Sequence, residues 1–162
     1  MSAAPTHPPI ICTDDAWLLN AVDPPINIAT IKEKMDHPYA NTPAALWWSI
    51  GDHEIYHYET QIGQLAGAES PTIAANVHHL IDTCGGPLTA LLDLCRNAGM
   101  QCFPRVRMNS HYDVEANAPG FGTLRQQHPK FLIGRPGNEY PAGSTEYGLR
   151  TGLDYALPQV RT

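Results

Sequence analysis

The sequence predicts an α/β fold built on a parallel sheet, and two observations lead to that prediction. Short apolar segments alternate with segments of helical periodicity, which is the pattern of consecutive strand–helix–strand units. Polar residues also gather where each apolar segment ends, and the carboxyl ends of parallel strands lie at one edge of a sheet. The expected architecture is a partial (β/α)8 barrel of the TIM type, comprising its first three or so strand–helix units with long loops.

Three segments are expected to form strands because they are short, apolar and followed by polar residues: residues 10–12, 44–50 and 100–106. Pro104 is expected to weaken the third strand or to mark a bulge, because proline cannot donate a ladder hydrogen bond. After Met108 the periodicity fades, and only short extended pieces are expected, at 131–134 and 153–156. The loops should therefore make up much of the C-terminal part.

Helices are expected at residues 27–37 and 87–98. Asn27 can cap the first, and Pro38 ends it. The second begins at a proline, carries an apolar stripe and is followed by Gly99, a typical C-terminal cap. Residues 158–161 resemble the first turn of another helix, so the sequence looks like the N-terminal part of a larger barrel. Residues 1–8 are expected to be an extended arm, and residues 9–162 a single α/β domain.

Composition excludes several classes of function. The formal net charge is −6, and the 10 Lys and Arg residues form no cluster, which argues against nucleic-acid binding. No apolar run approaches the roughly 20 residues of a membrane span, and the N-terminus lacks the pattern of a secretory signal. The chain as given is expected to be cytoplasmic, although a fragment could have lost an export signal. No nucleotide-binding glycine motif occurs, and no cofactor is expected.

Four cysteines are present: Cys12, Cys84, Cys95 and Cys102. None belongs to a C-x-x-C pair, so neither a zinc ribbon nor a disulfide framework is expected. Thiols in apolar stretches usually behave as small buried hydrophobic groups, and that is the role we assign to them.

The segment from Phe103 to Asp113 carries the richest polar chemistry. Arg, Asn, His and Asp follow the end of an expected strand within seven residues, and such donors and acceptors bind sugar hydroxyls or carboxylates. From the residues alone, a solvated loop is an equally good interpretation.

Three segments taken in order resemble the family-10-like glycosyl hydrolase proteins, which are (β/α)8 barrels. They are Arg107-Met108-Asn109-x-His111-x-Asp113, His128-Pro129-x-Phe131-Leu132-Ile133-Gly134, and Leu153-Asp154-Tyr155-Ala156-x-Pro158-x-Val160-Arg161. The resemblance implies a glycoside hydrolase-like protein that binds a carbohydrate substrate at its strand ends. The residues it assigns to substrate binding are Asp14, Asp15, Asp52, Arg107, Asn109, His111 and Asp113.

The chain departs from the family pattern at Ser110, where the family often has an acidic residue, and in the Thr-Asp-Asp sequence after its first strand. The family's acidic fourth-strand motif would follow the last residue of this chain. Glycosidases need two carboxyl groups across the scissile bond, so we expect no catalytic pair here and an inactive fragment. A non-catalytic carbohydrate-binding module is an alternative. An unclosed sheet edge should also favour self-association.

A competing motif is His53-Glu54-Ile55-Tyr56-His57, which matches the H-E-x-x-H sequence of zinc metalloproteases. In those enzymes the two histidines lie one turn apart on a helix. Here the tyrosines favour an extended conformation, so the interpretation we favour is a strand-end loop. Zinc binding by His53 and His57 is kept as the alternative.

Overall fold

The computed structural model describes residues 11–14, 16, 18–35, 45–52, 54–108, 115, 118, 121–135 and 137–161, and at residues 11–14 and 35 it describes the backbone alone. Residues 1–8, the expected arm, lie outside these ranges. The described part is a mixed α/β protein with an open, mixed sheet, which confirms the predicted fold class in its coarse form. Its strands are β1 (Ile11–Asp14), β2 (Ala45–Asp52), β3 (Ile55–Tyr56), β4 (Gln64–Leu65) and β5 (Gln101–Arg107).

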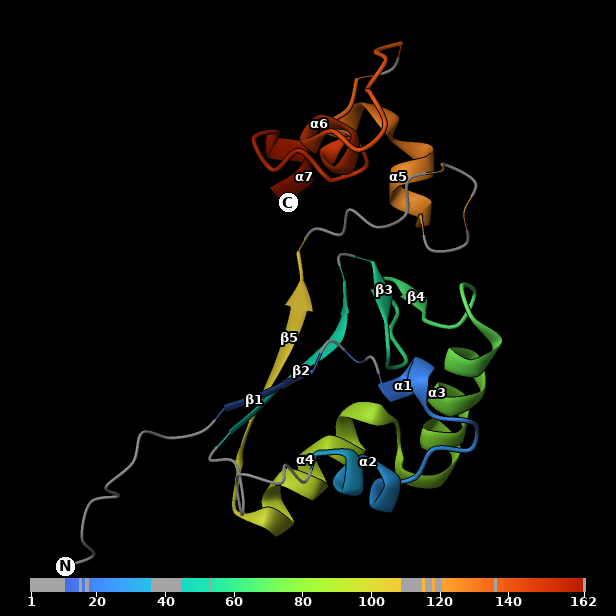
Figure 1. The fold of residues 1–162 in the computed structure, drawn as a ribbon, viewed down its shortest axis with the longest axis vertical. Coiled ribbons are helices and arrows are strands. Elements are labelled where there is room, and N and C mark those ends of the chain that lie inside the picture. The colour runs from blue at the N-terminus through green and yellow to red at the C-terminus, as the bar shows by residue number, and fades with distance from the viewer. Residues whose placement is uncertain are drawn as a thin grey trace, which may run out of the picture.

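The three strands expected from the sequence form the parallel part of the sheet. β2 lies in the middle, with β1 on one side and β5 on the other (Figure 1). A register shift between Ser49 and Asp52 interrupts the β2–β5 ladder. The sheet also has a part that was not expected, because Gly51 pairs in antiparallel fashion with Tyr56 of β3, and β3 then pairs with β4.

Helices of the first part of the chain cover one face of the parallel strands. They are α1 (Leu18–Ala21), α2 (Ile28–Met35), α3 (Pro71–Cys84) and α4 (Pro87–Ala98). Both predicted helices form, and Gly99 caps α4 in the left-handed conformation as expected. The core beneath them holds the apolar stripe of α4 together with Leu46 and Trp48 of β2. Cys95 belongs to this core, and burial together with the neighbouring Cys102 raises its pKa to about 12.

Helix α3 is the largest element that the sequence prediction did not include. The Ser70 hydroxyl accepts a hydrogen bond from Ile73 N, Pro71 occupies the first turn, and Gly85 ends the helix in the left-handed conformation. Within α3 the fully buried Asn76 accepts a hydrogen bond from Ile26 N (2.9 Å) and donates two more to the carbonyls of Leu19 and Val22 (2.9 Å each). This amide therefore fixes the connection between α1 and α2.

The opposite face of the parallel strands exposes aromatic residues. Trp47 and Phe103 are register partners on β2 and β5, their ring centroids lie 6.0 Å apart, and they are 41% and 46% exposed. Trp48, the next residue along β2, points into the helix-covered core and is 1% exposed. These two adjacent residues of β2 therefore lie on opposite faces of the sheet.

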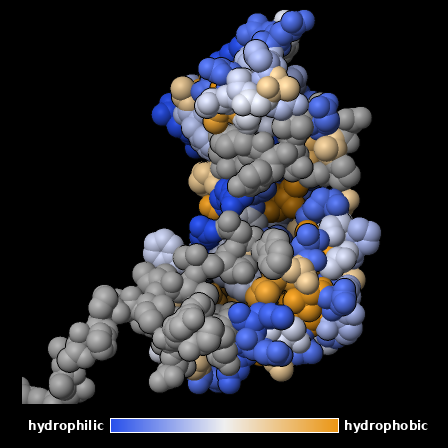
Figure 2. All heavy atoms as spheres, viewed as in Figure 1, coloured by the Kyte–Doolittle hydropathy of each residue, from blue (hydrophilic) through white to orange (hydrophobic). Residues whose placement is uncertain are grey.

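Residues 121–161 form a smaller unit, here called the lobe, beyond the carboxyl ends of the strands (Figure 1). Its elements are α5 (Thr123–Gln127), a short 3₁₀ helix (Pro129–Phe131), α6 (Thr145–Leu149) and α7 (Pro158–Arg161). A small second core of Phe121, Leu132 and Leu153 holds it together. Figure 2 shows a mostly hydrophilic lobe surface, whereas hydrophobic residues gather over the helices of the first part.

The extended pieces expected at 131–134 and 153–156 are largely replaced by turns. An isolated antiparallel bridge joins Leu132 to Leu153, and Ile133 N donates to Gly152 O at 2.8 Å. Two of the three segments that carry the family resemblance thus meet inside the lobe.

Candidate functional site

Polar side chains gather where the lobe meets the carboxyl ends of β2 and β5. We call this group the strand-end junction, and its described members are Asp52, Glu54, Tyr56, Arg107, Arg125 and Tyr155. They come from β2, the turn between β2 and β3, β3, β5, α5 and the loop before α7. In α/β proteins with parallel strands, ligands bind at this edge of the sheet, since the loops that follow the strands converge there.

Asp52 and Arg107 face each other across the last register pair of β2 and β5. Burial raises the pKa of the Asp52 carboxyl above its usual range, while the charges of Arg125 and Arg107 and the backbone N–H groups of Ile55 and Glu54 act to lower it. A carboxyl group in this setting offers a hydrogen-bond donor or acceptor to a ligand at the strand ends.

Arg125 of α5 is the most deeply buried charged group of the junction, with 1% of the residue exposed. Its Nη1 donates to Thr151 O at 3.1 Å, and its Cζ lies 5.0 Å from the centroid of the Phe121 ring. Its positive charge acts on both Asp52 and Glu54. A buried guanidinium needs such neighbours, because the cost of removing it from water is several kcal/mol.

Glu54 attaches the lobe to the sheet. Its Oε2 accepts a hydrogen bond from the backbone N–H of Leu124 at 2.7 Å, at the start of α5. A Cβ atom on Gly122, where φ is +87°, would lie 1.6 Å from Glu54 Oε1, so this approach requires glycine. Burial raises the pKa of Glu54, and its buried Oε1 has no hydrogen-bond partner among the described residues.

Tyrosine hydroxyls complete the junction. The Tyr155 hydroxyl donates to the carbonyl of Met108, just after β5. Burial raises the pKa values of Tyr155 and Tyr56, and the Asp52 carboxylate acts on both in the same direction. The rings of Tyr56 and Tyr58 lie 5.3 Å apart and form an aromatic surface beside the carboxyl groups.

The structure brings two of the seven predicted site residues together, namely Asp52 and Arg107. Asp14 ends β1 and pairs with Trp48, and its side chain is not among those described. The four others lie outside the described residues: Asp15, Asn109, His111 and Asp113.

The H-E-x-x-H segment is extended where the structure describes it, since Ile55 and Tyr56 form β3. His57 Nδ1 lies 3.2 Å from Ser49 O, and burial lowers the pKa of its imidazole. His53 lies outside the described residues. The helical turn that sets two histidines on one ion in zinc proteases is absent at β3, and no group of three or more potential metal ligands occurs among the described residues.

Four of the junction residues were not among the substrate-binding residues expected from the sequence: Glu54, Tyr56, Arg125 and Tyr155. Glu54 and Tyr56 belong to the zinc-like motif, and Tyr155 belongs to a family-like segment. Arg125 lies in a stretch with no recognisable pattern. The contact between Glu54 and α5 joins residues 70 positions apart, which no local spacing rule could indicate.

Comparisons with known proteins do not assign this chain: no protein-family model matches it, and no curated protein matches it significantly. None of the helices in the described residues combines the length and apolar character needed to cross a bilayer.

Proposed function

We propose that this chain forms the first strand–helix units of a (β/α)8 barrel of the glycoside-hydrolase type and binds carbohydrate at its strand-end junction. The observation that carries the proposal is the position of the junction at the carboxyl ends of neighbouring parallel strands, β2 and β5. That edge is where barrels of this class bind their substrates.

The uncovered face of the sheet is evidence in favour of a barrel. Parallel sheets are normally covered on both faces, yet Trp47 and Phe103 are exposed opposite the helix-covered core. The three parallel strands also neighbour one another in chain order, as consecutive barrel strands do. In a doubly wound sheet, helices would lie over both faces. Further strands, or a second copy of this chain, would cover the two aromatic rings.

The chemistry of the junction suits a ligand rich in hydroxyl groups. Asp52 can accept or donate hydrogen bonds, Arg107 can only donate, and the Tyr56–Tyr58 pair offers an aromatic surface to a sugar ring. Such mixed sites of charged, hydroxyl and aromatic groups recognise polar ligands through several geometrically fixed contacts.

We propose that the chain binds carbohydrate without cleaving it, because the described carboxyl groups do not form a catalytic pair. Hydrolysis of a glycoside needs one carboxyl group as acid and a second as nucleophile or base. Glu54 accepts the hydrogen bond of Leu124 N and packs against Gly122, so the described junction holds only one further carboxyl group, that of Asp52. A binding site without its own catalytic pair also agrees with the non-catalytic alternative.

The test is titration of the full chain with neutral oligosaccharides, followed by calorimetry. Asp52→Asn should weaken binding about ten- to hundredfold, because a hydrogen bond to a charged group contributes about 1.5–3 kcal/mol. Asp93→Asn is the matched control, since Asp93 lies on the exposed side of α4 and pairs with Arg96.

Because Asp52 could also support folding, Arg107→Gln provides a second variant, and each variant is checked for an unchanged melting temperature. Equal affinity of the parent and both junction variants would refute the proposal. Release of nitrophenol from aryl glycosides by the isolated chain would refute the claim that a catalytic pair is lacking.

A further inference from the structure

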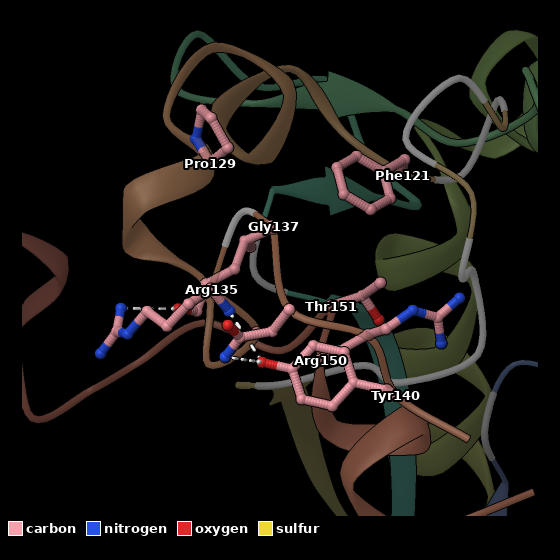
Figure 3. Close-up of a pocket in the computed structure, with 10 residues that line it drawn as sticks. Phe121, Pro129, Arg135, Gly137, Tyr140, Arg150 and Thr151 are labelled. Carbon is pink, nitrogen blue, oxygen red and sulfur yellow. Dashed lines mark hydrogen bonds between the residues drawn. The ribbon is translucent and has the colours of Figure 1, made fainter. Parts of the chain in front are cut away.

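A cavity of about 370 Å³ lies within the lobe (Figure 3), and the polar groups around it hold the lobe together. Arg135 forms a salt bridge with Asp154 at 2.8 Å, and Arg150 Nη1 donates to Tyr147 O at 2.6 Å. The Tyr140 hydroxyl accepts a hydrogen bond from the backbone N–H of Arg135 at 3.0 Å. A pair of reactive groups lies elsewhere, in the part of the chain that forms the sheet.

Cys95 and Cys102 lie next to each other where α4 leads into β5. Cys95 is in the last turns of α4 and is 1% exposed, whereas Cys102 is the second residue of β5 and is half-buried. Side chains alternate between the two faces of a strand, and Phe103 lies on the open face, so Cys102 points to the face that α4 covers. Both side chains pack in the same apolar core, and the Cys95 thiol donates a hydrogen bond to the sulfur of Cys102.

We propose that Cys95 and Cys102 form a reversible disulfide by exchange with a low-molecular-weight disulfide of the glutathione class, and that this bond fastens α4 to β5. The inference goes beyond carbohydrate binding and does not depend on it.

The turn between the two thiols holds their backbones in place. Gly99 ends α4 in the left-handed conformation with φ +67°, and the backbone N–H of Met100 donates to Cys95 O at 2.8 Å. On the sheet, Cys102 is the register partner of Leu46, which is fully buried. A disulfide requires its two Cα atoms to lie within about 7 Å of each other, so two thiols in contact on a fixed turn are well placed to form one.

The other cysteines are placed differently. In α3 the thiol of Cys84 donates to Leu80 O at 3.1 Å, within its own helix. Cys12 and Cys102 are register partners of Leu46 on opposite sides of β2, so their Cα atoms are separated by two strand spacings, about 9–10 Å. That separation is larger than a disulfide spans. The fold therefore brings Cys102 together with the thiol of α4.

The exchange proceeds in two steps that conserve atoms and electrons. The thiolate of Cys102, the more exposed of the two residues, attacks one sulfur of the small disulfide and forms a mixed disulfide. The first small thiol leaves and takes up the proton that Cys102 lost. The thiolate of Cys95 then attacks the Cys102 sulfur, and the second small thiol leaves with the proton of Cys95. The two protein thiols are oxidised by two electrons, and the small disulfide is reduced by the same two.

The surroundings of Cys95 make the second step dependent on pH. Burial is the main cause that raises the pKa of Cys95 to about 12, and the charge of Cys102 and the hydrogen bond to it contribute further. Both contributions of Cys102 disappear once its sulfur is part of the mixed disulfide. Because the thiolate is the attacking species, closure of the disulfide should be slow near pH 7 and should accelerate up to about tenfold per pH unit above it.

The experiment incubates the full, folded chain with oxidised glutathione at pH 8, followed by alkylation and intact mass spectrometry. Two of the four cysteines should become resistant to alkylation without the gain of a glutathione. The melting temperature should rise by about 5–10 °C, because the bond closes a loop of eight residues, 95–102. Dithiothreitol should reverse both changes.

Three variants identify the pair. Cys84→Ala is the matched control and should oxidise as the parent does. Cys95→Ala should stop at the mixed disulfide, with one glutathione on Cys102. Because Cys95→Ala also removes a core side chain, the half-buried Cys102→Ala provides a second variant, which should remain folded and form no internal disulfide.

Several outcomes would overturn the proposal. A folded parent that keeps all its thiols, or that accumulates only the mixed disulfide, would mean that the two cysteines serve only as apolar packing groups. An internal disulfide in Cys102→Ala would assign the bond to another pair. An unchanged or lower melting temperature after oxidation would refute the claim that the bond fastens α4 to β5.

Discussion

The two parts of the molecule are stabilised in different ways. The sheet half, residues 11–108, buries a large apolar cluster between β2 and helices α1–α4. The lobe has a three-residue apolar core and relies on arginines: Arg125 is buried against Phe121, Arg135 binds Asp154, and Arg150 stacks on Tyr147. A unit with so little apolar burial depends on its contacts with the rigid part for its position.

This difference has a functional consequence. Binding residues tend to lie on loops that a rigid scaffold positions, and the lobe is a loop-rich unit set on the strand ends of a packed sheet. Two groups link the lobe to the strand ends and also belong to the candidate ligand site: Glu54, which binds Leu124 N, and Arg125, whose charge acts on Asp52 and Glu54. Docking and binding should therefore be coupled, whereas the sheet half should be stable without the lobe contacts.

The largest effect should come from the sheet half. Trp48→Ala is expected to lower the free energy of unfolding by about 3–5 kcal/mol, because it leaves a cavity in the main core. Urea denaturation measures the change. Trp47→Ala, one residue away on the exposed face, is the matched control and should cost about 1 kcal/mol or less. Similar losses in both variants would mean that the two faces of β2 are equally buried.

A smaller and more local effect is expected for the lobe. Arg125→Met should cost about 3 kcal/mol locally, since it removes the hydrogen bond to Thr151 O and leaves Asp52 and Glu54 without that cation. Hydrogen exchange should show lost protection in residues 121–161 and unchanged protection in α3 and α4. Gln126→Met, the exposed neighbour, should leave both parts protected. Loss of protection throughout the chain would show that the two parts unfold together.

The sequence predicted the sheet half better than the lobe, for a physical reason. Strands β1, β2 and β5 and helices α2 and α4 follow from local apolar periodicity, caps and prolines. Helix α3 carried the same signals in Ser70, Pro71 and Gly85, but its buried polar Asn76 and two adjacent histidines obscured the apolar stripe.

The lobe and the junction depend on contacts between distant residues. Asp52 and Arg107 could be predicted because each ends an expected parallel strand. The contacts of Arg125 with Thr151 and of Glu54 with Leu124 join segments without periodicity, through backbone groups that every residue type offers. Such contacts leave no residue-type signature in the sequence.

The smallest expected effect is a pH dependence of the free energy of unfolding. The junction carboxyl groups and His57 should contribute to this dependence with opposite signs. Burial raises the pKa values of Asp52 and Glu54 above 3.8 and 4.5, so the folded state holds their protons more tightly than the unfolded chain does. The free energy of unfolding should therefore fall as the pH rises from about 4 through the raised pKa values of these carboxyl groups. The Asp52→Asn/Glu54→Gln double variant should lose this decrease, as measured by urea midpoints between pH 4 and pH 7.

His57, in the sheet half, acts in the opposite direction. Burial lowers the pKa of its imidazole below 6.5, so the folded state resists protonation. Its stabilising contribution is complete above pH 6.5 and is lost as the pH falls through that value towards the lowered pKa. His57→Gln should remove the loss of stability that occurs below pH 6.5. It should leave the decrease in stability that the carboxyl groups cause at rising pH unchanged. An identical pH profile in the parent and in both variants would mean that neither the junction carboxyl groups nor His57 are desolvated in solution, and that the lobe does not close over the strand ends.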